Sequence, residues 1–183
     1  MSDVSDNLLD TLRGGDRRSI QGVLEVIRRV SHDPGLFGTL FDGLAHEDPL
    51  VRMRCADAIE KITAIHPEYL EPFKRQVMQL ASESREKELR WHFAQMLPRL
   101  DLDSRERRRA VNILNSYLED SSSIVRTFAM QALADIAAVD EELRPPIVDR
   151  IRDLTQCGTP AMKSRGRKLL ARLAETGAEP TAP

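Results

Sequence analysis

The residues best suited to catalysis or metal binding in this 183-residue chain are four histidines and two cysteines. A zinc site needs histidine, cysteine or carboxylate ligands at characteristic short intervals. The histidines show no such interval, and the cysteines are too far apart in sequence for a zinc knuckle or a disulfide framework. We therefore expect no bound metal. The residues concerned are His32, His46, His66, His92, Cys55 and Cys157.

Motifs that bind cofactors or activate nucleophiles are also missing from the sequence. It contains no glycine-rich loop that would hold a phosphate, no dinucleotide-binding fingerprint and no Ser-His-Asp set. Cys55 falls at a core position and is expected to be a small buried apolar residue. We therefore expect no catalytic residue and no cofactor.

The composition is that of a globular chain without a strong charge bias. Lys and Arg together number 27, Asp and Glu number 29, and the formal net charge is -2. A general attraction to nucleic acid or to an anionic membrane is therefore not implied. No apolar run approaches the roughly 18 residues of a membrane span, and the acidic stretch from Met1 to Asp10 does not resemble a signal peptide. We expect a soluble, cytoplasmic protein.

Apolar residues recur at spacings of three and four along nearly the whole chain, which is the period of an amphipathic α-helix. No glycine lies between Gly43 and Gly158, and the alternation typical of strands is missing. The sequence therefore predicts an all-α fold.

The helical pattern repeats with a period of about 37 residues. Five segments align on a basic residue, and apolar residues follow it at offsets of 3, 6, 7 and 10, which is one stripe of a helix. The aligned basic residues are Arg17, Arg52, Arg90, Arg126 and Lys163. The core residues predicted in the first two segments are Ile20, Val23, Leu24 and Ile27, and then Cys55, Ala58, Ile59 and Ile62.

Capping signals mark where several of these helices begin and end. Asp48-Pro49 and Thr159-Pro160 each place a capping side chain before a proline at the first helical position. Ser121 and Ser122 offer the same kind of cap ahead of Arg126. Pro98 is expected to end or kink the third of these helices.

Together these patterns predict about five stacked antiparallel helix pairs that form a single repeat domain over residues 7–174. End repeats are commonly atypical because one of their faces meets water, which suits the short first helix before Gly14 and Gly15. Residues 1–6 are expected to be a flexible N-terminus and residues 175–183 a disordered tail. The pairs are expected at about 7–31, 34–66, 68–100, 103–138 and 140–174.

Two of the segments resemble HEAT repeats. One is Asp48-Pro49-Leu50-Val51-Arg52, followed by Cys55, Ala58, Ile59 and Ile62. The other is Ser122-Ser123-Ile124-Val125-Arg126, followed by Ala129, Ala132, Leu133 and Ile136. The resemblance covers about nine-tenths of the chain. It implies a right-handed α-solenoid in which the second helix of each pair lines the concave side, and a role in binding other macromolecules.

On that architecture, the positions opposite the core stripe line a concave groove. They lie at offsets of 1, 5 and 8 from the aligned basic residue and include Pro98 and Ala134. We expect a protein or peptide partner to contact this row. The residues expected at the contact are Met53, Asp57, Trp91, Gln95, Thr127 and Gln131.

Trp91 is the only tryptophan and the most informative member of the row. An exposed tryptophan beside a methionine such as Met53 has the character of a binding hot spot. The alternative is that Trp91 packs against Phe128 or Arg54 of neighbouring helices.

Two sets of basic residues allow a second interpretation. The five aligned residues could follow phosphates, but a structural ladder, in which Arg52 and Arg90 pair with nearby carboxylates such as Asp48 and Glu86, is the better account. A possible basic patch on the last helix either caps the array in solvent or binds an acidic partner or nucleic acid. Its residues are Arg165, Lys168 and Arg172.

The expected function is therefore a non-enzymatic binding or scaffold module for a protein or peptide. One alternative is a nucleic-acid binder or a HEAT-like DNA base-excision enzyme, for which Trp91 and Asp57 resemble the aromatic and carboxylate residues of the concave face. Another is an accessory subunit of a larger enzyme, such as a lyase-type HEAT subunit. The pair His46-Glu47 is similar to the His-Glu pairs of HEAT-fold di-iron hydroxylases, but those enzymes need several such pairs.

Overall fold

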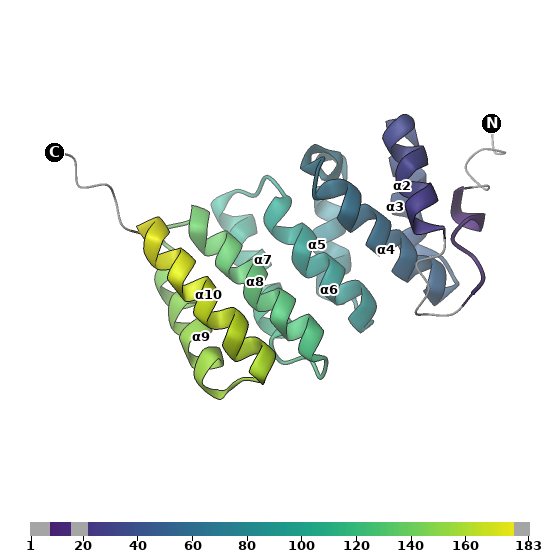
Figure 1. Cartoon of the computed structure of the whole chain (residues 1–183). Coiled ribbons are helices and arrows are strands. Elements are labelled where there is room, and N and C mark those ends of the chain that lie inside the picture. The colour runs from purple at the N-terminus through teal and green to yellow at the C-terminus, as the bar shows by residue number, and fades with distance from the viewer. Residues whose placement is uncertain (1–7, 16–21, 178–183) are drawn as a thin grey trace. The chain divides into compact units, whose positions relative to one another are not determined.

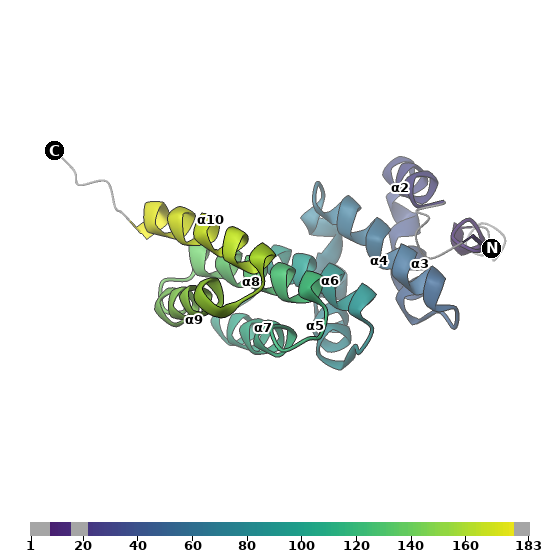
Figure 2. The ribbon, with the colours of Figure 1, turned by 60° about the horizontal axis from the view of Figure 1, so that its bottom comes forward.

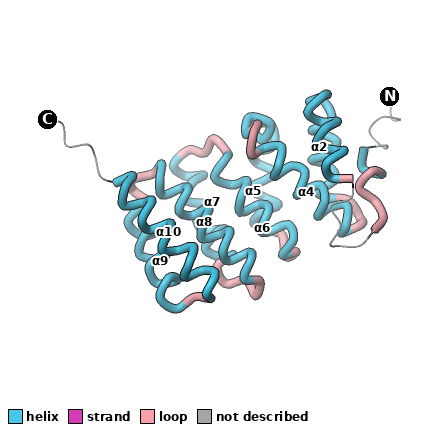
Figure 3. Tube along the Cα trace, in the orientation of Figure 1, coloured by secondary structure: helices cyan, strands magenta, loops and turns pink. Residues whose placement is uncertain are grey.

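The structure is a computed structural model of the chain, and it describes residues 8–15 and 22–177. These residues form helices and loops with no strand among them (Figure 3). The all-α prediction is therefore confirmed. The chain divides into two compact units, Met1–Val77 and Met78–Pro183, and each unit is described by itself.

The first unit begins with a helical turn at residues 8–10 and continues with α2 (Val23–His32), α3 (Phe37–Asp42) and α4 (Pro49–Thr63) (Figure 1). Short 3-10 segments follow α2, α3 and α4, namely η1 (Pro34–Leu36), η2 (Gly43–Ala45) and η3 (Pro67–Phe73). Helix α5 (Lys74–Glu83) starts at the end of this unit. Helix α4 packs against α2 and α3, and the ring of Phe41 stacks on that of Phe73 at 4.3 Å between centroids.

A buried arginine joins the N-terminal turn to α4. The Nη1 atom of Arg54 donates hydrogen bonds to the carbonyl oxygens of Leu12 at 2.7 Å and Gly14 at 2.6 Å. Leu8 and Leu12 are themselves fully buried. A buried guanidinium is tolerated only where hydrogen bonds compensate for the lost water, so these contacts fix the path of residues 8–14 in the first unit.

The second unit contains α6 (Lys87–Met96), α7 (Ser104–Tyr117), α8 (Ser123–Val139), α9 (Arg144–Cys157) and α10 (Pro160–Gly177). A 3-10 turn, η4 (Leu97–Arg99), follows α6. Helix α8 is central in this unit because it contacts α6, α7, α9 and α10. Figure 2 shows α6, α8 and α10 in one layer and α7 and α9 in another.

The core stripes predicted for the last four segments are confirmed. Every residue at the four offsets is buried except Leu170, which is half-buried. These offsets place one face of α4, α6, α8 and α10 against the neighbouring helices. The buried residues are Cys55, Ala58, Ile59 and Ile62; Phe93, Met96, Leu97 and Leu100; Ala129, Ala132, Leu133 and Ile136; and Gly166, Leu169 and Leu173.

The predicted helix ends are confirmed with one change. The Oδ1 atom of Asp48 accepts a hydrogen bond from the amide of Leu50 at 2.8 Å, and the hydroxyl of Thr159 accepts one from the amide of Met162 at 3.3 Å. Ser122 occupies the cap position of α8, but its side chain makes no capping bond. Helix α6 ends at Met96, directly before η4 with its proline.

The core stripe predicted for the first segment is confirmed at Val23 and wrong at Leu24 and Ile27, and its Ile20 lies outside the described residues. Helix α2 begins at Val23 and buries Val23, Val26 and Val30, whereas Leu24 is 61% exposed and Ile27 is only half-buried. The preceding Gly22 has a φ of 79°, in the left-handed region, and a Cβ there would overlap the carbonyl oxygen of Thr11. Counting helical positions from Arg17 through Gly22, as if one helix continued, therefore assigns the wrong residues to the buried face of α2. Arg17 lies outside the described residues.

Two smaller predictions are also wrong. Helix α10 extends to Gly177, so residues 175–177 are helical rather than part of a tail. Ala134 is fully buried, although it was expected opposite the core, because neighbouring helices contact α8 on several sides. Residues 1–6 and 178–183 lie outside the described residues, and the single array over residues 7–174 stays a prediction.

Candidate functional site

An open depression of about 380 Å³ lies in the second unit, where α6 and η4 meet α8. Its walls are apolar at Pro98 and Phe128 and polar at Gln95 and Gln131. The structure therefore brings two of the predicted contact residues, Gln95 and Gln131, together at one concave feature. The full lining is Ala94, Gln95, Pro98, Arg99, Phe128, Gln131, Ala132 and Asp135.

The end of α6 shapes one wall of this depression. Met96 and Leu97 are fully buried and hold the end of the helix in the core. Pro98 then replaces α-helix by the 3-10 turn η4 and remains half-buried in the depression. Because a proline lacks the amide hydrogen that a continuing helix would use, the chain turns away at this point and leaves the space beside α8 open.

Trp91 is half-buried and packs on the neighbouring helix, as the alternative interpretation predicted. Its ring lies edge-on to that of Phe128, with 5.5 Å between centroids, and also contacts His92 at 4.5 Å. The side-chain amide of Gln95 donates to the Trp91 carbonyl oxygen at 3.3 Å. The Trp91–Phe128 pair thus carries an aromatic surface from α6 onto α8, beside the depression.

A polar network joins α8 to α10 at the opposite edge. Arg165 Nη1 donates to the Oε1 atom of Gln131 at 3.0 Å, and the Nε2 atom of Gln131 donates to the Oδ1 atom of Asp135 at 2.9 Å. Arg172 Nη2 pairs with the same Asp135 oxygen at 2.6 Å. Two residues of the predicted basic patch therefore contact two residues that line the depression. Lys168 is exposed on the same helix, between them in sequence.

The remaining predicted contact residues lie apart from this network. The hydroxyl of Thr127 donates to the carbonyl oxygen of Ser123 at 2.7 Å, in its own helix. Met53 and Asp57 are half-buried residues of α4, in the first unit, where Asp57 forms an ion pair with Lys61. Met53 and Asp57 thus belong to a different unit from the residues that line the depression.

Two of the aligned basic residues, Arg52 and Arg90, bind the backbone or a carboxylate, as the structural interpretation predicted. Arg52 Nη1 donates to the carbonyl oxygens of His46 at 2.7 Å and Glu47 at 3.0 Å. Arg90 Nε donates to the Ser84 carbonyl oxygen at 2.8 Å, and Arg90 Nη1 pairs with Asp120 at 2.6 Å. The pairing of Arg90 thus differs from the predicted one with Glu86, because its side chain reaches the turn before α8.

The environment of Asp120 favours its charged form. Burial raises the pKa of this carboxyl, but the amide of Ser122 and the guanidinium groups of Arg90 and Arg126 outweigh burial, so the pKa lies below its ordinary value. The amide of Ser122 donates to the Oδ1 atom of Asp120 at 2.8 Å. Asp120 therefore holds the turn before α8 and pairs with α6 at the same time.

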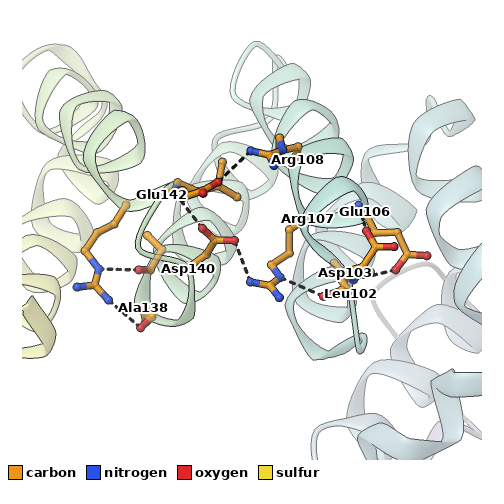
Figure 4. Close-up of polar contacts among 11 residues, drawn as sticks. Leu102, Asp103, Glu106, Arg107, Arg108, Ala138, Asp140 and Glu142 are labelled. Carbon is orange, nitrogen blue, oxygen red and sulfur yellow. Dashed lines mark hydrogen bonds and ion pairs between the residues drawn. The ribbon is translucent and has the colours of Figure 1, made fainter.

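A second carboxylate, that of Asp140, has a comparable role ahead of α9 (Figure 4). Arg107 of α7 donates to the Leu102 carbonyl oxygen at 3.0 Å and pairs with Asp140 at 2.8 Å. The Oδ1 atom of Asp140 accepts from the amide of Leu143 at 3.0 Å, just before α9. The two ion pairs thus tie α6 to the turn before α8 and α7 to the turn before α9.

Sequence reasoning missed Phe128 and Asp135 as surface residues of the site. Phe128 directly follows the predicted Thr127, and Asp135 lies four residues after Gln131, on the same helical face. The predicted row took only positions opposite the core. A row that also took the next position along the helix would have included Phe128 and Asp135. The contact of Asp135 with α10 depends on how α8 and α10 cross, and a local sequence pattern does not predict how two helices cross.

Within residues 8–15 and 22–177 no group of three or more His, Cys, Asp and Glu side chains is placed to hold a metal ion. His46 lies in a turn, where its Nδ1 atom accepts from the amide of Asp48 at 2.9 Å. In the same residues, none of the helices combines the length and apolarity needed to cross a membrane.

Comparisons with known proteins bear on the fold alone. No protein-family model matches the chain, and no curated protein matches it. Among solved structures, the chain is similar to an engineered protein from the Northeast Structural Genomics Consortium, with a TM-score of 0.65 and 17% sequence identity. The match covers 96% of this chain and 81% of that one. At this identity the likeness supports the all-helical fold and carries no information about function.

Proposed function

We propose that the chain is a HEAT-like helical-repeat protein, a right-handed α-solenoid of about five helix pairs, that binds a protein or peptide and catalyses no reaction. The repeated core stripe and the capping signals support the repeat architecture. The depression between α6 and α8 is the proposed centre of the binding surface.

Three helices, α6, α8 and α10, present side chains to one surface, and contacts between the helices hold those side chains in place. This observation carries the proposal. Trp91 is held by Phe128, and Arg165 is held by Gln131. Side chains that are ordered before binding lose little conformational entropy when a partner arrives. Such a surface suits recognition of a folded or extended chain by many weak contacts.

A pull-down with a blocked depression tests the proposal. Gln95→Tyr adds a large uncharged side chain to the wall of the depression, and Asn112→Tyr adds the same group at an exposed position on α7. We expect the wild type and Asn112→Tyr to recover the same partner from cells that produce the chain. Gln95→Tyr should recover at least about tenfold less. Equal recovery by both variants, with both folded by circular dichroism, would argue against this surface.

Nucleic-acid binding is the second candidate, and the cations of α10 are the observation in its favour. A protein that binds phosphates loses affinity steeply as salt rises, because counterions are released on binding. Duplex DNA should therefore bind at low salt if this candidate is right. We expect no binding of duplex DNA at low salt.

A further inference from the structure

We infer that the depression and the adjoining face of α10 bind an acidic peptide segment, whose carboxylates pair with Arg165, Lys168 and Arg172 while an apolar side chain enters the space beside Phe128. This inference rests on the proposed function and specifies the chemistry of the partner. It is carried by the charge of the network between α8 and α10 and by the apolar wall of the depression.

Positive charge exceeds negative charge across this network. Arg165, Lys168 and Arg172 carry three positive charges, whereas Asp135 supplies the negative charge that pairs with Arg172. A peptide that brings carboxylates to this face would complete the charge balance. Charge complementarity of this kind selects partners and speeds their association.

The two arginines are oriented by α8 but keep donors for a ligand. A guanidinium group has five N–H donors. Arg165 uses one of them on Gln131, and Arg172 uses one on Asp135. The Arg172 side chain is 44% exposed, and Arg165 and Lys168 are exposed residues. The contacts with α8 therefore hold each guanidinium in place without covering it.

The spacing of the cations predicts the spacing of the acidic residues in the partner. Arg165 and Arg172 are seven residues apart on one helix, which corresponds to about 10 Å along its axis. A peptide in the polyproline II conformation advances about 3.1 Å per residue with about three residues per turn, so side chains three residues apart share one face. Carboxylates three residues apart in such a segment would therefore meet both guanidinium groups, with Lys168 between them.

The apolar lining of the depression favours a peptide over a nucleic acid. Pro98 and Phe128 offer a surface for an aliphatic or aromatic side chain, and Gln95 and Gln131 offer amides for a peptide backbone. The chain as a whole has a net charge of -2 and gives no long-range attraction to a polyanion. A short acidic peptide segment with one apolar side chain can contact the lining of the depression and does not depend on a long-range attraction to a polyanion.

The fluorescence of Trp91 provides the readout because it is the only tryptophan of the chain. The probe is a synthetic peptide of about twelve residues, with glutamate at every third position and leucine among the intervening residues. A matched peptide carries glutamine in place of each glutamate. We expect the glutamate peptide to change Trp91 emission and the glutamine peptide to bind at least about tenfold more weakly.

Two double variants of the full chain localise the binding. Arg165→Gln with Arg172→Gln removes the proposed contacts, and Arg105→Gln with Arg109→Gln removes the same charge from exposed positions on α7. We expect the first pair to weaken binding at least about tenfold and the second to change it by less than about twofold. Thermal unfolding of both variants shows whether the fold is retained. Equal loss in both pairs would overturn the inference, as would unchanged affinity in the first.

A random peptide library displayed on phage separates this inference from the proposed function. Enrichment of acidic sequences that change Trp91 emission supports both. Enrichment of neutral or basic sequences that change it overturns the acidic partner and leaves the proposed function standing. If no sequence is enriched, or if none changes Trp91 emission, both fail. A single-stranded or duplex oligonucleotide that binds more tightly than the glutamate peptide overturns the choice of a peptide.

Discussion

The guanidinium group of Arg90 pairs with the carboxylate of Asp120 at 2.6 Å and thereby ties α6 to the turn before α8. The same guanidinium lies over the ring of Tyr117 at 5.2 Å from its centroid. The Asp120 side chain is only 8% exposed. One arginine thus joins three elements of the second unit, and the walls of the depression depend on their relative positions.

Replacement of Asp120 by Asn should destabilise the protein by about 1–3 kcal/mol, because it removes a charged partner from a largely buried arginine. Asn retains an oxygen that can accept from the amide of Ser122, so the hydrogen bond in the turn before α8 is not the main loss. Asp149→Asn is the control, since Asp149 pairs with Arg152 at the surface and is 72% exposed. It should cost less than about 0.5 kcal/mol. Urea unfolding measures both, and equal losses would contradict the role of Asp120.

The effect of Asp120→Asn should shrink at low pH. The pKa of Asp120 is lowered in the folded protein, so its charge stabilises the fold above the unfolded pKa of about 3.9 and loses this effect as pH falls through the folded pKa. The difference in unfolding free energy between wild type and variant should therefore be full at pH 6 and smaller near pH 3. A constant difference between these pH values would show that Asp120 acts without its charge.

Gly166→Ala should destabilise the second unit by about 1–3 kcal/mol through overpacking. A Cβ at Gly166 would overlap the hydroxyl of Thr155 and lie 2.6 Å from the terminal methyl of Met130. Thr155→Ala should recover part of the loss in the double variant. Gly38→Ala in α3 is the control, because the nearest atom to its Cβ is 3.9 Å away, and it should be neutral or stabilising by up to about 1 kcal/mol. Thermal unfolding compares the four proteins.

Arg54→Met should loosen the N-terminal residues of the first unit. The variant keeps a long apolar side chain but leaves the carbonyl oxygens of Leu12 and Gly14 without the Arg54 donor, at a cost of about 1–3 kcal/mol. Hydrogen exchange at residues 8–14 should become faster than in the wild type. Lys61→Met, on the same helix, is expected to leave exchange there unchanged. Protected amides at residues 8–14 in Arg54→Met would contradict the anchoring role.

Tyr117→Phe should destabilise the protein by about 1–2 kcal/mol, because the buried hydroxyl donates to the Ala81 carbonyl oxygen at 2.6 Å. Burial also raises the pKa of Tyr117 above its ordinary value. Because the folded pKa is the higher one, the protonated hydroxyl stabilises the fold below the unfolded pKa of about 10, and this effect fades as pH rises beyond it. Denaturant unfolding of the wild type and variant at pH 7 measures the loss, and equal stability would contradict the role of the bond.

Local pattern predicted most of the helices because each carries its own signals. The stripe of Cys55, Ala58 and Ile59 and the cap at Asp48-Pro49 both lie within one helix. The first segment failed because Gly22 adopts a left-handed conformation, which breaks the count from Arg17 and moves the buried face to Val26. A glycine can adopt that conformation or a helical one, and the sequence does not distinguish them.

Only some residues of the site were predictable. Gln95 and Gln131 follow from the face opposite the core, and the structure places both at the depression. The network of Asp135 with Arg172 was not predictable, because it depends on two helices whose side chains meet across 37 residues of sequence. The orientation of Trp91 toward Phe128 likewise depends on the distance between α6 and α8.

Nuclear magnetic resonance of the full chain with an acidic peptide enriched from the phage-displayed library tests the central claim most directly. The side-chain amides of Gln95 and Gln131 and the indole of Trp91 each give their own signal. Binding at the depression should shift these three signals, while amides of α7 that face away, such as that of Asn112, stay in place. Shifts confined to α7 and α9, with the signals of Gln95, Gln131 and Trp91 unchanged, would contradict it.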